Sequence, residues 1–481
     1  MNRFVNYNTD FYSLGITFFQ LLTGRLPYTS EDPSELIYQH IAAAMPHIKE
    51  INPSLPTQLD EIVAKLMSKN PEGRYNSAIG LLSDLGKCRD QWNETHNISL
   101  FPLAENDVSE EFSIREKIYG REAELKEVKG YFQRAVEGRF TVCYIEGVSG
   151  IGKSAFVAEL YKDIVKEKGN YGIGKFDQFK RNIPYSALIQ ALNQVIQQIL
   201  KESPEKVERW KHILKESLGN NSGLLFSVFP DLKLIIGDVE LVEIDDQALA
   251  KNRFVLAFKN LIKGFSQEDA PLVIFLDDLQ WIDSATLLLF TDFFNSVNIQ
   301  EKNYTFIIGA YRDNEVGTDH PLTMVLHDFE QRGFPKRSIK LEPLSVSAIN
   351  QLCADALERN LEDTKELVNL IYTKTGGSPF FVKQFLENLY ERGFIYLNRS
   401  NKNWTWQIDK VKAAGFTDNV VDLIKEKLHK LDDRVISVLK IASCFGQQFD
   451  IVDIVNISSL HRPEVVTALE KSMEEDIYKI L

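Results

Sequence analysis

Hydrophobic and polar residues follow three successive patterns along the chain. Up to about Trp92, apolar residues recur with the helical period of about 3.6 residues, and prolines interrupt the pattern. From about Lys117 to His320, short apolar runs alternate with helical stretches, which predicts a parallel sheet wrapped by helices. After Leu341 the helical period returns, with a hairpin-like stretch at 403–408. The pattern therefore predicts a multidomain chain in which an α/β region lies between two mostly helical ones.

The apolar runs of the middle region are the strands that we expect in its sheet. They are short and are separated by helical stretches, as in folds whose parallel strands are connected by helices. The predicted strands are 141–145, 171–177, 272–276 and 305–310. An acidic stretch at 104–111 offers little apolar surface to bury, so we expect it to be a linker before this region.

A glycine-rich motif with the spacing G-x-x-x-x-G-K-S joins the first predicted strand to a helical stretch. Its characteristic residues are Gly147, Gly150, Gly152, Lys153 and Ser154. Glycines let backbone N–H groups surround an anion, and the helix that follows directs its positive dipole end at the same point. In such loops the lysine reaches the outer phosphates and the serine hydroxyl binds Mg²⁺. A glycine-rich turn without a ligand is the alternative, but the flanking strand and helix favour a nucleoside triphosphate site, with ATP and Mg²⁺ as the expected cofactors.

Two acidic residues follow the strand predicted at 272–276. Asp277 and Asp278 would lie at the carboxyl end of a buried parallel strand, where ligands bind in such folds. We expect Asp277 to hold Mg²⁺ through water and Asp278 to polarise the attacking water. Paired acids can also form a solvated turn, but the phosphate-binding motif upstream favours the Mg²⁺ site. Arg312 follows another predicted strand, and we expect it to contact the γ-phosphate, with a surface arginine as the alternative.

Composition narrows the classes of partner. The 55 lysines and arginines against 68 aspartates and glutamates give a net charge of −13, which argues against electrostatic binding to nucleic acid or an anionic membrane. The 4 cysteines are far apart, so neither a zinc site nor a disulfide framework is indicated. The N-terminal residues lack a signal-peptide pattern, and no apolar run approaches the roughly 20 residues that span a bilayer. We expect a cytoplasmic protein whose partners are ATP or ADP and other signalling domains, with homo-oligomers left open.

Five motifs occur in the order typical of one family of ATPases. They are Y-G-R-E-A-E-L at 119–125, the phosphate-binding motif at 147–154, D-D-L-Q-W-I-D at 277–283, G-A-Y-R-D-N-E at 309–315 and G-G-S-P-F-F at 376–381. This succession resembles the ATPase module of the STAND class, which comprises signal-transduction relatives of the AAA+ ATPases. The resemblance extends from about Lys117 to the end of the chain. It is specific because several independent motifs agree.

The resemblance implies roles for further residues. Gly120 and Arg121 are expected near the nucleotide, and Pro379 is expected to close over its base from a helical subdomain. A winged-helix-like module is expected after about Gly415. In this class, exchange of ATP for ADP and slow hydrolysis of ATP to ADP and phosphate switch the module between closed and open states. The implied activity is therefore a slow ATPase that acts as a switch.

The first helical segment carries a second resemblance. Its residues 7–28 are similar to the long C-lobe helix of eukaryotic-type Ser/Thr protein kinases, and residues 69–75 resemble the arginine turn that closes that lobe. Such a kinase also needs a glycine-rich loop, a V-A-I-K lysine, H-R-D and D-F-G, and none of these precedes the helix. We therefore expect no kinase activity from this segment. Without the resemblance, the stretch is a helical bundle with apolar residues such as Phe11 and Leu21 in its core.

These patterns and resemblances give the expected domain boundaries. They are a partial kinase C-lobe at 1–95, a linker at 96–116, the ATPase core at 117–335, a helical lid subdomain at 336–400 and an incomplete winged-helix-like region at 401–481. This order resembles an internal piece of large multidomain signalling kinases that combine Ser/Thr kinase and histidine kinase modules, as in two-component systems.

Two other functions remain open from the sequence. One is a part of an active Ser/Thr protein kinase, and the other is a DNA-binding ATPase of the origin-recognition or transcription-regulator type. In the final stretch from Asp418, lysines and arginines are mixed with acids, so no basic face is evident. Binding to nucleic acid is therefore not expected.

Overall fold

In a computed structural model of the chain, the described residues are 7–474 except for 31, 42, 106, 108–111, 116, 179–182, 240–246, 299, 332–336, 399–402, 414–427, 429–430, 446–448 and 459. Contacts between residues divide the chain into two compact units. Unit 1 comprises Met1–Gly120, Ser345–Thr373 and Leu386–Phe416, and unit 2 comprises Arg121–Leu344, Lys374–Phe385 and Thr417–Leu481. The start of the predicted winged-helix-like module, near Gly415, lies outside the described residues.

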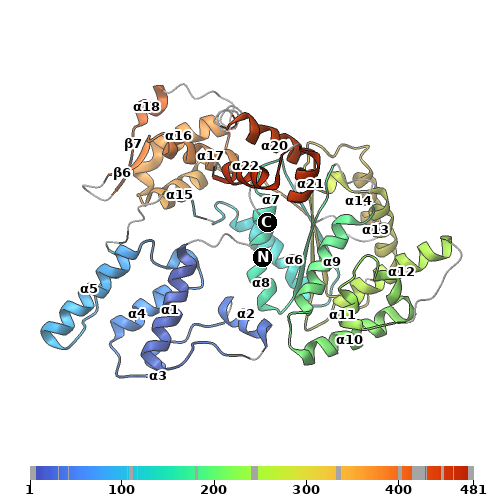
Figure 1. Cartoon of the computed structure of the whole chain (residues 1–481), viewed down its shortest axis with the longest axis horizontal. Helices are drawn as coiled ribbons and strands as arrows, with labels where there is room; N and C mark the ends of the chain where they lie inside the picture. Colours follow the sequence, from blue (N-terminus) through green and yellow to red (C-terminus); the bar gives the residue numbers. More distant parts are fainter. Residues whose placement is uncertain are drawn as a thin grey trace. The chain divides into compact units, whose positions relative to one another are not determined.

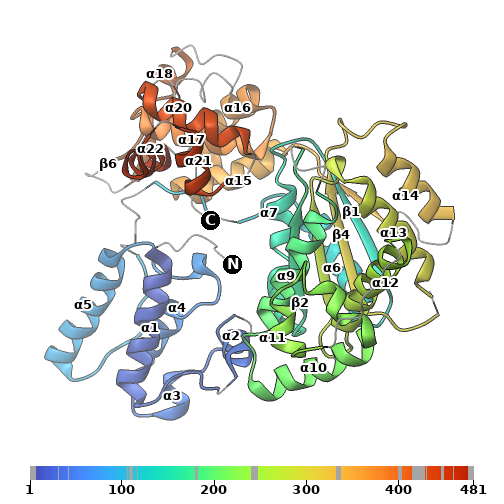
Figure 2. The same ribbon diagram turned by 45° about the vertical axis from the view of Figure 1, so that its right-hand side comes forward.

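A parallel sheet forms the centre of unit 2 (Figure 2). Its five strands lie in the order β2-β3-β4-β1-β5, and all of their pairings are parallel. The strands are β1 (Thr141–Glu146), β2 (Asn170–Lys175), β3 (Leu272–Asp277), β4 (Thr305–Tyr311) and β5 (Ser338–Lys340). The four runs predicted from the sequence are confirmed as strands, whereas the short β5 was not predicted. The predicted α/β fold with a parallel sheet is therefore confirmed.

Helices connect and cover these strands. In unit 2 they are α6 (Glu122–Val136), α7 (Lys153–Ala158), α8 (Tyr161–Lys166), α9 (Ser186–Ile199), α10 (Pro204–Leu218), η2 (Gly219–Leu225), α11 (Leu232–Ile236), α12 (Gln247–Phe265), η3 (Leu279–Trp281), α13 (Ser284–Ser296) and α14 (Pro321–Gln331). Helix α6 packs against β1 and β4, and Phe132 of α6 lies against Phe306 of β4 with ring centroids 6.3 Å apart. Ile307, the next residue of β4, belongs to the core on the opposite face. The sheet is therefore covered on both faces, as its run of buried residues requires.

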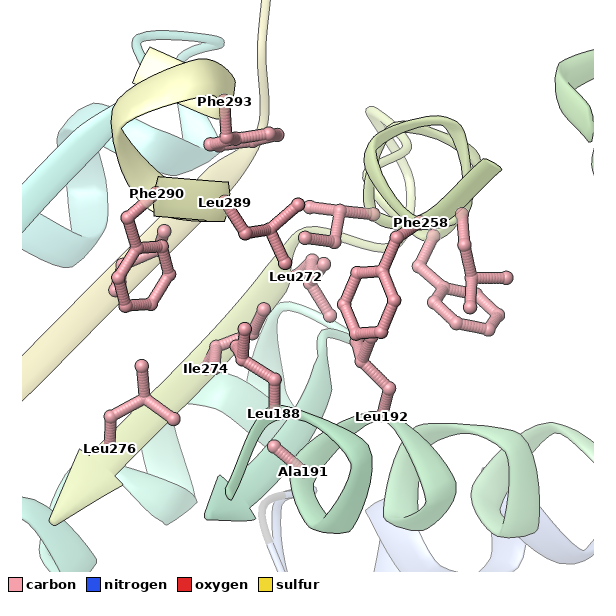
Figure 3. Packing of buried hydrophobic residues seen from close by; sticks show 14 of the residues in the cluster. Leu188, Ala191, Leu192, Phe258, Leu272, Ile274, Leu276, Leu289, Phe290 and Phe293 are labelled. Carbon is pink, nitrogen blue, oxygen red and sulfur yellow. The ribbon is translucent and has the colours of Figure 1, made fainter. Parts of the chain in front are cut away.

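The main core of unit 2 lies between β3 and the helices α9, α12 and α13 (Figure 3). Leu272, Ile274 and Leu276 project from one face of β3, because alternate residues of a strand point to the same side, and each is at most 1% exposed. They face Leu188 and Leu192 of α9. Burial of side chains of this size contributes about 1.5–3 kcal/mol each. This packing fixes the carboxyl end of β3, where the two predicted acids lie.

Helix α9 approaches β2 closely because two glycines leave room for its backbone. A Cβ atom on Gly172 would lie 2.2 Å from the carbonyl oxygen of Ala191, and one on Gly174 would lie 1.9 Å from that of Ala187. Any other residue at these positions would collide with the backbone of the helix, which has little freedom to move in a packed core. The two glycines therefore set the distance between α9 and the sheet.

Three glutamines of α9, the glutamine ladder, cover the outer edge of β2. Each side-chain oxygen accepts a hydrogen bond from a backbone N–H of the strand. The pairs are Gln190 with Lys175 at 2.9 Å, Gln194 with Ile173 at 3.0 Å and Gln198 with Tyr171 at 3.2 Å. Gln194 and Gln198 also donate to the carbonyl oxygens of their partners. Because β2 is an end strand, the ladder satisfies backbone groups that would otherwise be open to another strand.

The first part of unit 1 is a bundle of helices in which α1 packs against α4 (Figure 1). The elements are α1 (Tyr7–Thr23), α2 (Pro33–Ile41), α3 (Ile48–Ile51), α4 (Thr57–Leu66), η1 (Pro71–Gly73) and α5 (Ala78–Thr95). Phe11 and Phe19 of α1 are buried, with 9% and 0% of their surface exposed. Leu21 is 75% exposed, so its predicted place in the core is wrong. It follows Phe19 by two residues, which places it about 200° around the helix, on the other side.

Unit 1 also contains helices and a hairpin from later in the chain. They include α15 (Val346–Leu357), most of α16 (Leu361–Thr375), β6 (Ile395–Asn398), β7 (Asn403–Trp406) and α18 (Ile408–Ala413). Strands β6 and β7 pair in antiparallel fashion. The hairpin predicted at 403–408 is therefore misplaced in part, because that range holds only β7, its partner β6 lies earlier in the chain, and Ile408 begins α18. Trp404 of β7 is 2% exposed and packs with Phe112 and Tyr390, with ring centroids 5.6 and 5.9 Å away.

Four further helices complete the described structure. Helix α17 (Pro379–Glu391) begins in unit 2, and α20 (Asp433–Cys444), α21 (Ile451–Ile457) and α22 (Arg462–Glu474) lie in its last segment. These last three helices have a small core of their own, in which Val438, Ile454 and Val465 are fully buried. None of the helices in the described ranges is both long enough and apolar enough to cross a membrane.

Candidate functional site

The predicted phosphate-binding loop connects β1 to α7 in unit 2. Gly147, Gly150 and Gly152 have φ angles of +152°, +76° and +94°, which residues other than glycine rarely adopt. A Cβ atom on Gly147 would also lie 2.9 Å from the backbone oxygen of Leu341. The glycines are thus required by the shape of the loop, in agreement with the sequence pattern that identified them.

Lys153 is the first residue of α7, and its side chain folds back over the loop. The ammonium donates to the carbonyl oxygens of Gly147 at 2.6 Å and Val148 at 3.0 Å, and the residue is only 7% exposed. Burial lowers the pKa of Lys153, while the negative charges of Asp277 and Asp278 act in the opposite direction. A cation is therefore held at the centre of the loop, next to the acids.

Ser154 and Asp277 are brought into direct contact. The serine hydroxyl donates to Oδ2 of Asp277 at 2.7 Å, and Oδ1 of the same carboxylate accepts from the backbone N–H of Asp278 at 2.9 Å. Asp277 is 5% exposed. A hydroxyl oxygen and a carboxylate oxygen are hard ligands of the kind that Mg²⁺ prefers, so this pair fits the predicted metal. Their proposed role as Mg²⁺ ligands stays a prediction.

Asp278 occupies a strained turn between β3 and η3. Its φ of +56° is uncommon for a residue with a side chain, and it is 5% exposed. Oδ2 lies 3.2 Å from Nζ of Lys175, and Oδ1 lies 3.6 Å from Nε of Arg312. Oδ1 also accepts a hydrogen bond from Gln280 at 2.9 Å. The carboxylate is therefore surrounded by two cations and an amide.

Arg312 follows β4 and points toward these acids rather than into bulk water. Its Nη1 pairs with Glu315 at 2.7 Å, and its guanidinium lies 4.8 Å from the ring centroid of Trp281. The side chain is 23% exposed. Strand order explains its position, because β4 is the neighbour of both β1 and β3. The arginine is thus close to the predicted water-polarising residue, Asp278.

Arg121 and Gly120 fall in different units. Arg121 is 6% exposed, donates from Nη2 to the carbonyl oxygen of Glu342, and lies 3.5 Å from a carboxylate oxygen of Glu124. Gly120 belongs to unit 1, with a φ of +62°, and a Cβ atom there would lie 2.7 Å from that of Ala348. The predicted place of both residues beside the nucleotide stays a prediction.

Pro379 begins helix α17, and the next residue contacts the phosphate-binding loop. The backbone N–H of Phe380 donates to the carbonyl oxygen of Gly150 at 3.3 Å. A Cβ atom on Gly150 would lie 3.1 Å from Cβ of Phe380. The turn before Pro379 is held by a bond from the N–H of Leu344 to the carbonyl of Gly377 at 2.8 Å. The start of α17 is thus bonded to the loop, although the contact of Pro379 with a base stays a prediction.

Sequence reasoning missed three residues that contact the predicted site. Lys175 ends β2 and lies 3.2 Å from Asp278 and 3.8 Å from Asp277. Gln280 bonds to Asp278, and His320 bonds to the backbone of Gln280. The pairing of β2 with β3, which sets Lys175 opposite Asp277, brings the lysine to the acids. No local sequence signal gives that register, because it depends on two strands that are far apart in the chain.

Comparison with known proteins finds a family that matches the central segment. The AAA ATPase domain family matches residues 117–308. The hybrid signal transduction histidine kinase G of Dictyostelium discoideum is 30% identical over 99% of this chain, which spans 16% of that protein. The serine/threonine-protein kinase PrkC of Bacillus subtilis is 38% identical over 82 residues, or 17% of this chain and 13% of that kinase. The chain is thus similar to an AAA ATPase domain and to kinases, and it spans about a sixth of the length of the first relative.

A comparison of structures adds a solved ATPase. The Walker-type ATPase of Pyrococcus abyssi aligns with 75% of this chain and 91% of its own, at 14% identity and a TM-score of 0.33.

Proposed function

We propose that this chain is an ATP-binding, slowly hydrolysing ATPase switch of the STAND type within a signal-transduction kinase. The observation that carries the proposal is the bond between Ser154 and Asp277 at 2.7 Å. It joins the phosphate-binding loop to the acid pair that ends β3. With Lys153 beside it, this arrangement offers a cation for phosphates and oxygen ligands for a metal at one point.

Each residue of this cluster has a proposed role in hydrolysis. Lys153 would bind the outer phosphates, and Ser154 and Asp277 would hold Mg²⁺, which would neutralise phosphate charge. Asp278 accepts a hydrogen bond from the attacking water and orients it. Arg312 turns from Asp278 to the γ-phosphate and stabilises the negative charge there. The chemistry is positioning and electrostatic stabilisation, so no covalent intermediate with the protein is involved.

The switch in this proposal depends on contacts that ATP and ADP do not share. Of the phosphates of ATP, Arg312 would contact only the γ-phosphate. Phe380 ties the start of α17 to Gly150 of the loop by a hydrogen bond of 3.3 Å. A ligand shifts a conformational equilibrium only through such differential contacts. We therefore infer that loss of the γ-phosphate changes the packing of α17 and of Pro379 at its start.

The first segment is proposed to be a kinase C-lobe without its own catalytic residues. Its apolar residues form a helical core, and residues 1–95 contain no glycine-rich loop, no H-R-D motif and no D-F-G motif. The similarity to PrkC favours a kinase origin for part of the chain. An active Ser/Thr kinase is the second candidate function on this ground. The boundaries at 95, 116, 335 and 400 belong to the same proposal.

Titration calorimetry with ATP and ADP in the presence of Mg²⁺ tests nucleotide binding. Lys153→Ala removes the charge opposite the outer phosphates and leaves the glycines in place, so we expect tight ATP binding to be lost. Equal affinity of the variant and the wild type for ATP contradicts the nucleotide site.

Hydrogen exchange across 341–392 with ATP, with ADP and without nucleotide tests the switch. The same protection in all three conditions contradicts it.

A further inference from the structure

The side chain of Gln280 connects the two strand ends that carry Asp278 and Arg312. Gln280 lies in η3 and is 3% exposed. Its Nε2 donates to Oδ1 of Asp278 at 2.9 Å, and its Oε1 accepts from the backbone N–H of Arg312 at 3.2 Å. The two partners follow β3 and β4, which are neighbours in the sheet. One buried amide therefore spans both halves of the proposed hydrolytic site.

The orientation of this amide is fixed by its partners. A backbone N–H can only donate, so the amide oxygen faces Arg312 and the amide nitrogen faces the Asp278 carboxylate. The backbone of Gln280 is held as well, because its carbonyl accepts from Nε2 of His320 at 3.1 Å. Nδ1 of His320 accepts from the N–H of Leu322 at 3.1 Å, which places the ring proton on Nε2. Both the backbone and the side chain of Gln280 are thus anchored.

Gln280 differs from the other side chains around Asp278 in carrying no charge. Lys175 lies 3.2 Å from Oδ2 and Arg312 lies 3.6 Å from Oδ1. Both are cations that phosphate attracts, so their contacts with Asp278 weaken when ATP binds beside them. The amide of Gln280 has no such competitor and keeps its bond to Oδ1. Oδ2 is then the carboxylate oxygen that is left to accept a hydrogen bond from water.

The geometry points to Gln280 as a positioning residue that orients the Asp278 carboxylate and sets the place of Arg312 at the same time. This inference rests on the proposed hydrolysis of ATP. A base must lie within hydrogen-bond reach of the water that it polarises, and a misplacement of about 1 Å costs about 10²-fold in rate. Because one side chain bonds to both residues, their positions relative to a single γ-phosphate are set together.

Substitution of Gln280 in the full chain tests this role. Gln280→Met removes both the donor and the acceptor, and we expect single-turnover hydrolysis to slow by about 10–100-fold. The Kd for ATP should change by less than about threefold, which separates positioning from binding. The ratio of ATP to ADP affinity should move toward one, because the backbone of Arg312 loses its acceptor. Gln280→His should restore most of the rate, since a neutral imidazole offers one donor and one acceptor.

Matched controls keep the test decisive. Gln331→Met makes the same change at an exposed position of α14 and should leave rate and affinity at wild-type values. A wild-type rate in Gln280→Met overturns the inference, and so does a parallel loss of binding, rate and unfolding temperature. If Gln280→Met does not fold, Gln280→Ala decides, because it also removes both the donor and the acceptor and places no charge beside Asp278. A wild-type rate in that variant also overturns the inference.

The two proposals fail in different ways. A wild-type chain that binds ATP and hydrolyses it, with an unaffected Gln280→Met variant, contradicts the role of Gln280 alone. A wild-type chain that neither binds nor hydrolyses ATP contradicts the proposed function, and the inference about Gln280 is lost with it.

Discussion

The hydroxyl of Ser154 donates to Oδ2 of Asp277 at 2.7 Å, across a separation of 123 residues in the sequence. The parallel sheet makes this contact possible, because β1 and β3 end at the same edge with β4 between them. Two oxygen atoms that can bind a metal, from motifs far apart in the sequence, therefore lie next to each other.

Ser154→Ala removes one of these two proposed metal ligands. We expect the Mg²⁺ concentration for half-maximal hydrolysis to rise about tenfold or more, because the metal loses a ligand. Titration of the hydrolysis rate with Mg²⁺ at saturating ATP measures the effect. Ser437→Ala, at an exposed position of α20, serves as the control. An unchanged Mg²⁺ requirement would remove Ser154 from the proposed metal site.

Asp278→Asn keeps the size and polarity of the side chain but weakens its ability to polarise water. ATP should therefore stay bound while hydrolysis falls by about 10²-fold or more. Calorimetry for binding and single-turnover hydrolysis for the rate separate the two effects. If binding is lost instead, Asp278 rather than Asp277 is the principal Mg²⁺ acid.

Arg312→Ala should narrow the gap between the affinities for ATP and ADP without abolishing either. The reason is that the proposed contact of Arg312 involves only the γ-phosphate, which ADP lacks. Calorimetric Kd values for both nucleotides, compared with those of the exposed control Arg89→Ala, provide the measurement. An unchanged ratio would show that Arg312 serves the structure through Glu315 and Trp281 and does not sense the nucleotide.

The first segment should transfer no phosphate to protein substrates. Residues 1–95 contain no glycine-rich loop, V-A-I-K lysine, H-R-D or D-F-G motif, which in protein kinases position the ATP phosphates and accept the hydroxyl proton. The full chain with Lys153→Ala, mixed with labelled ATP and a generic substrate, isolates this activity from the proposed ATPase. Labelled substrate would support the second candidate, an active kinase.

Gly174→Ala should destabilise unit 2 by about 1–3 kcal/mol, because an added Cβ atom meets the backbone of α9. That atom would lie 1.9 Å from the carbonyl oxygen of Ala187. Gly130→Ala in α6 is the matched control, since a Cβ atom there meets no atom within 4 Å. Alanine in a helix should stabilise that variant by about 0.5–1 kcal/mol. Denaturant unfolding followed by fluorescence compares the two, and equal stability would contradict the close packing.

The parts of the site that the sequence predicted are those with contiguous signals. The glycines around Lys153 have positive φ angles because the loop requires them. The same requirement restricts these positions to glycine, so the motif can be recognised in the sequence. Asp277 and Asp278 were found because charged residues at the end of a buried strand stand out from its apolar run. Arg312 followed from the same reasoning on β4. In each case the signal lies within one element and the turn that follows it.

The parts that the sequence did not predict depend on distant pairings or on very short elements. Lys175 reaches the acids only through the register of β2 with β3. Gln280 accepts a hydrogen bond from the backbone N–H of Arg312, 32 residues away, and a backbone donor does not depend on residue type, so the sequence carries no signal for it. Strand β5 has three residues, of which only Ile339 is buried, so it carries no usable alternation. Leu21 was misplaced because apolar residues occur at many positions of α1, so the pattern alone did not decide which side of the helix its neighbours cover.

The glutamine ladder is possible because the helix and the strand advance by nearly equal distances between successive hydrogen-bonded residues. Four residues of helix advance by about 6.0 Å, and two residues of strand advance by about 6.6 Å. The mismatch of about 0.6 Å per step lets three glutamines meet alternate strand residues, and a much longer ladder would drift out of hydrogen-bond range. Edge-to-edge joining of two sheets through β2 would have to break these bonds first. Assembly into oligomers through that edge therefore competes with the chain's own side chains.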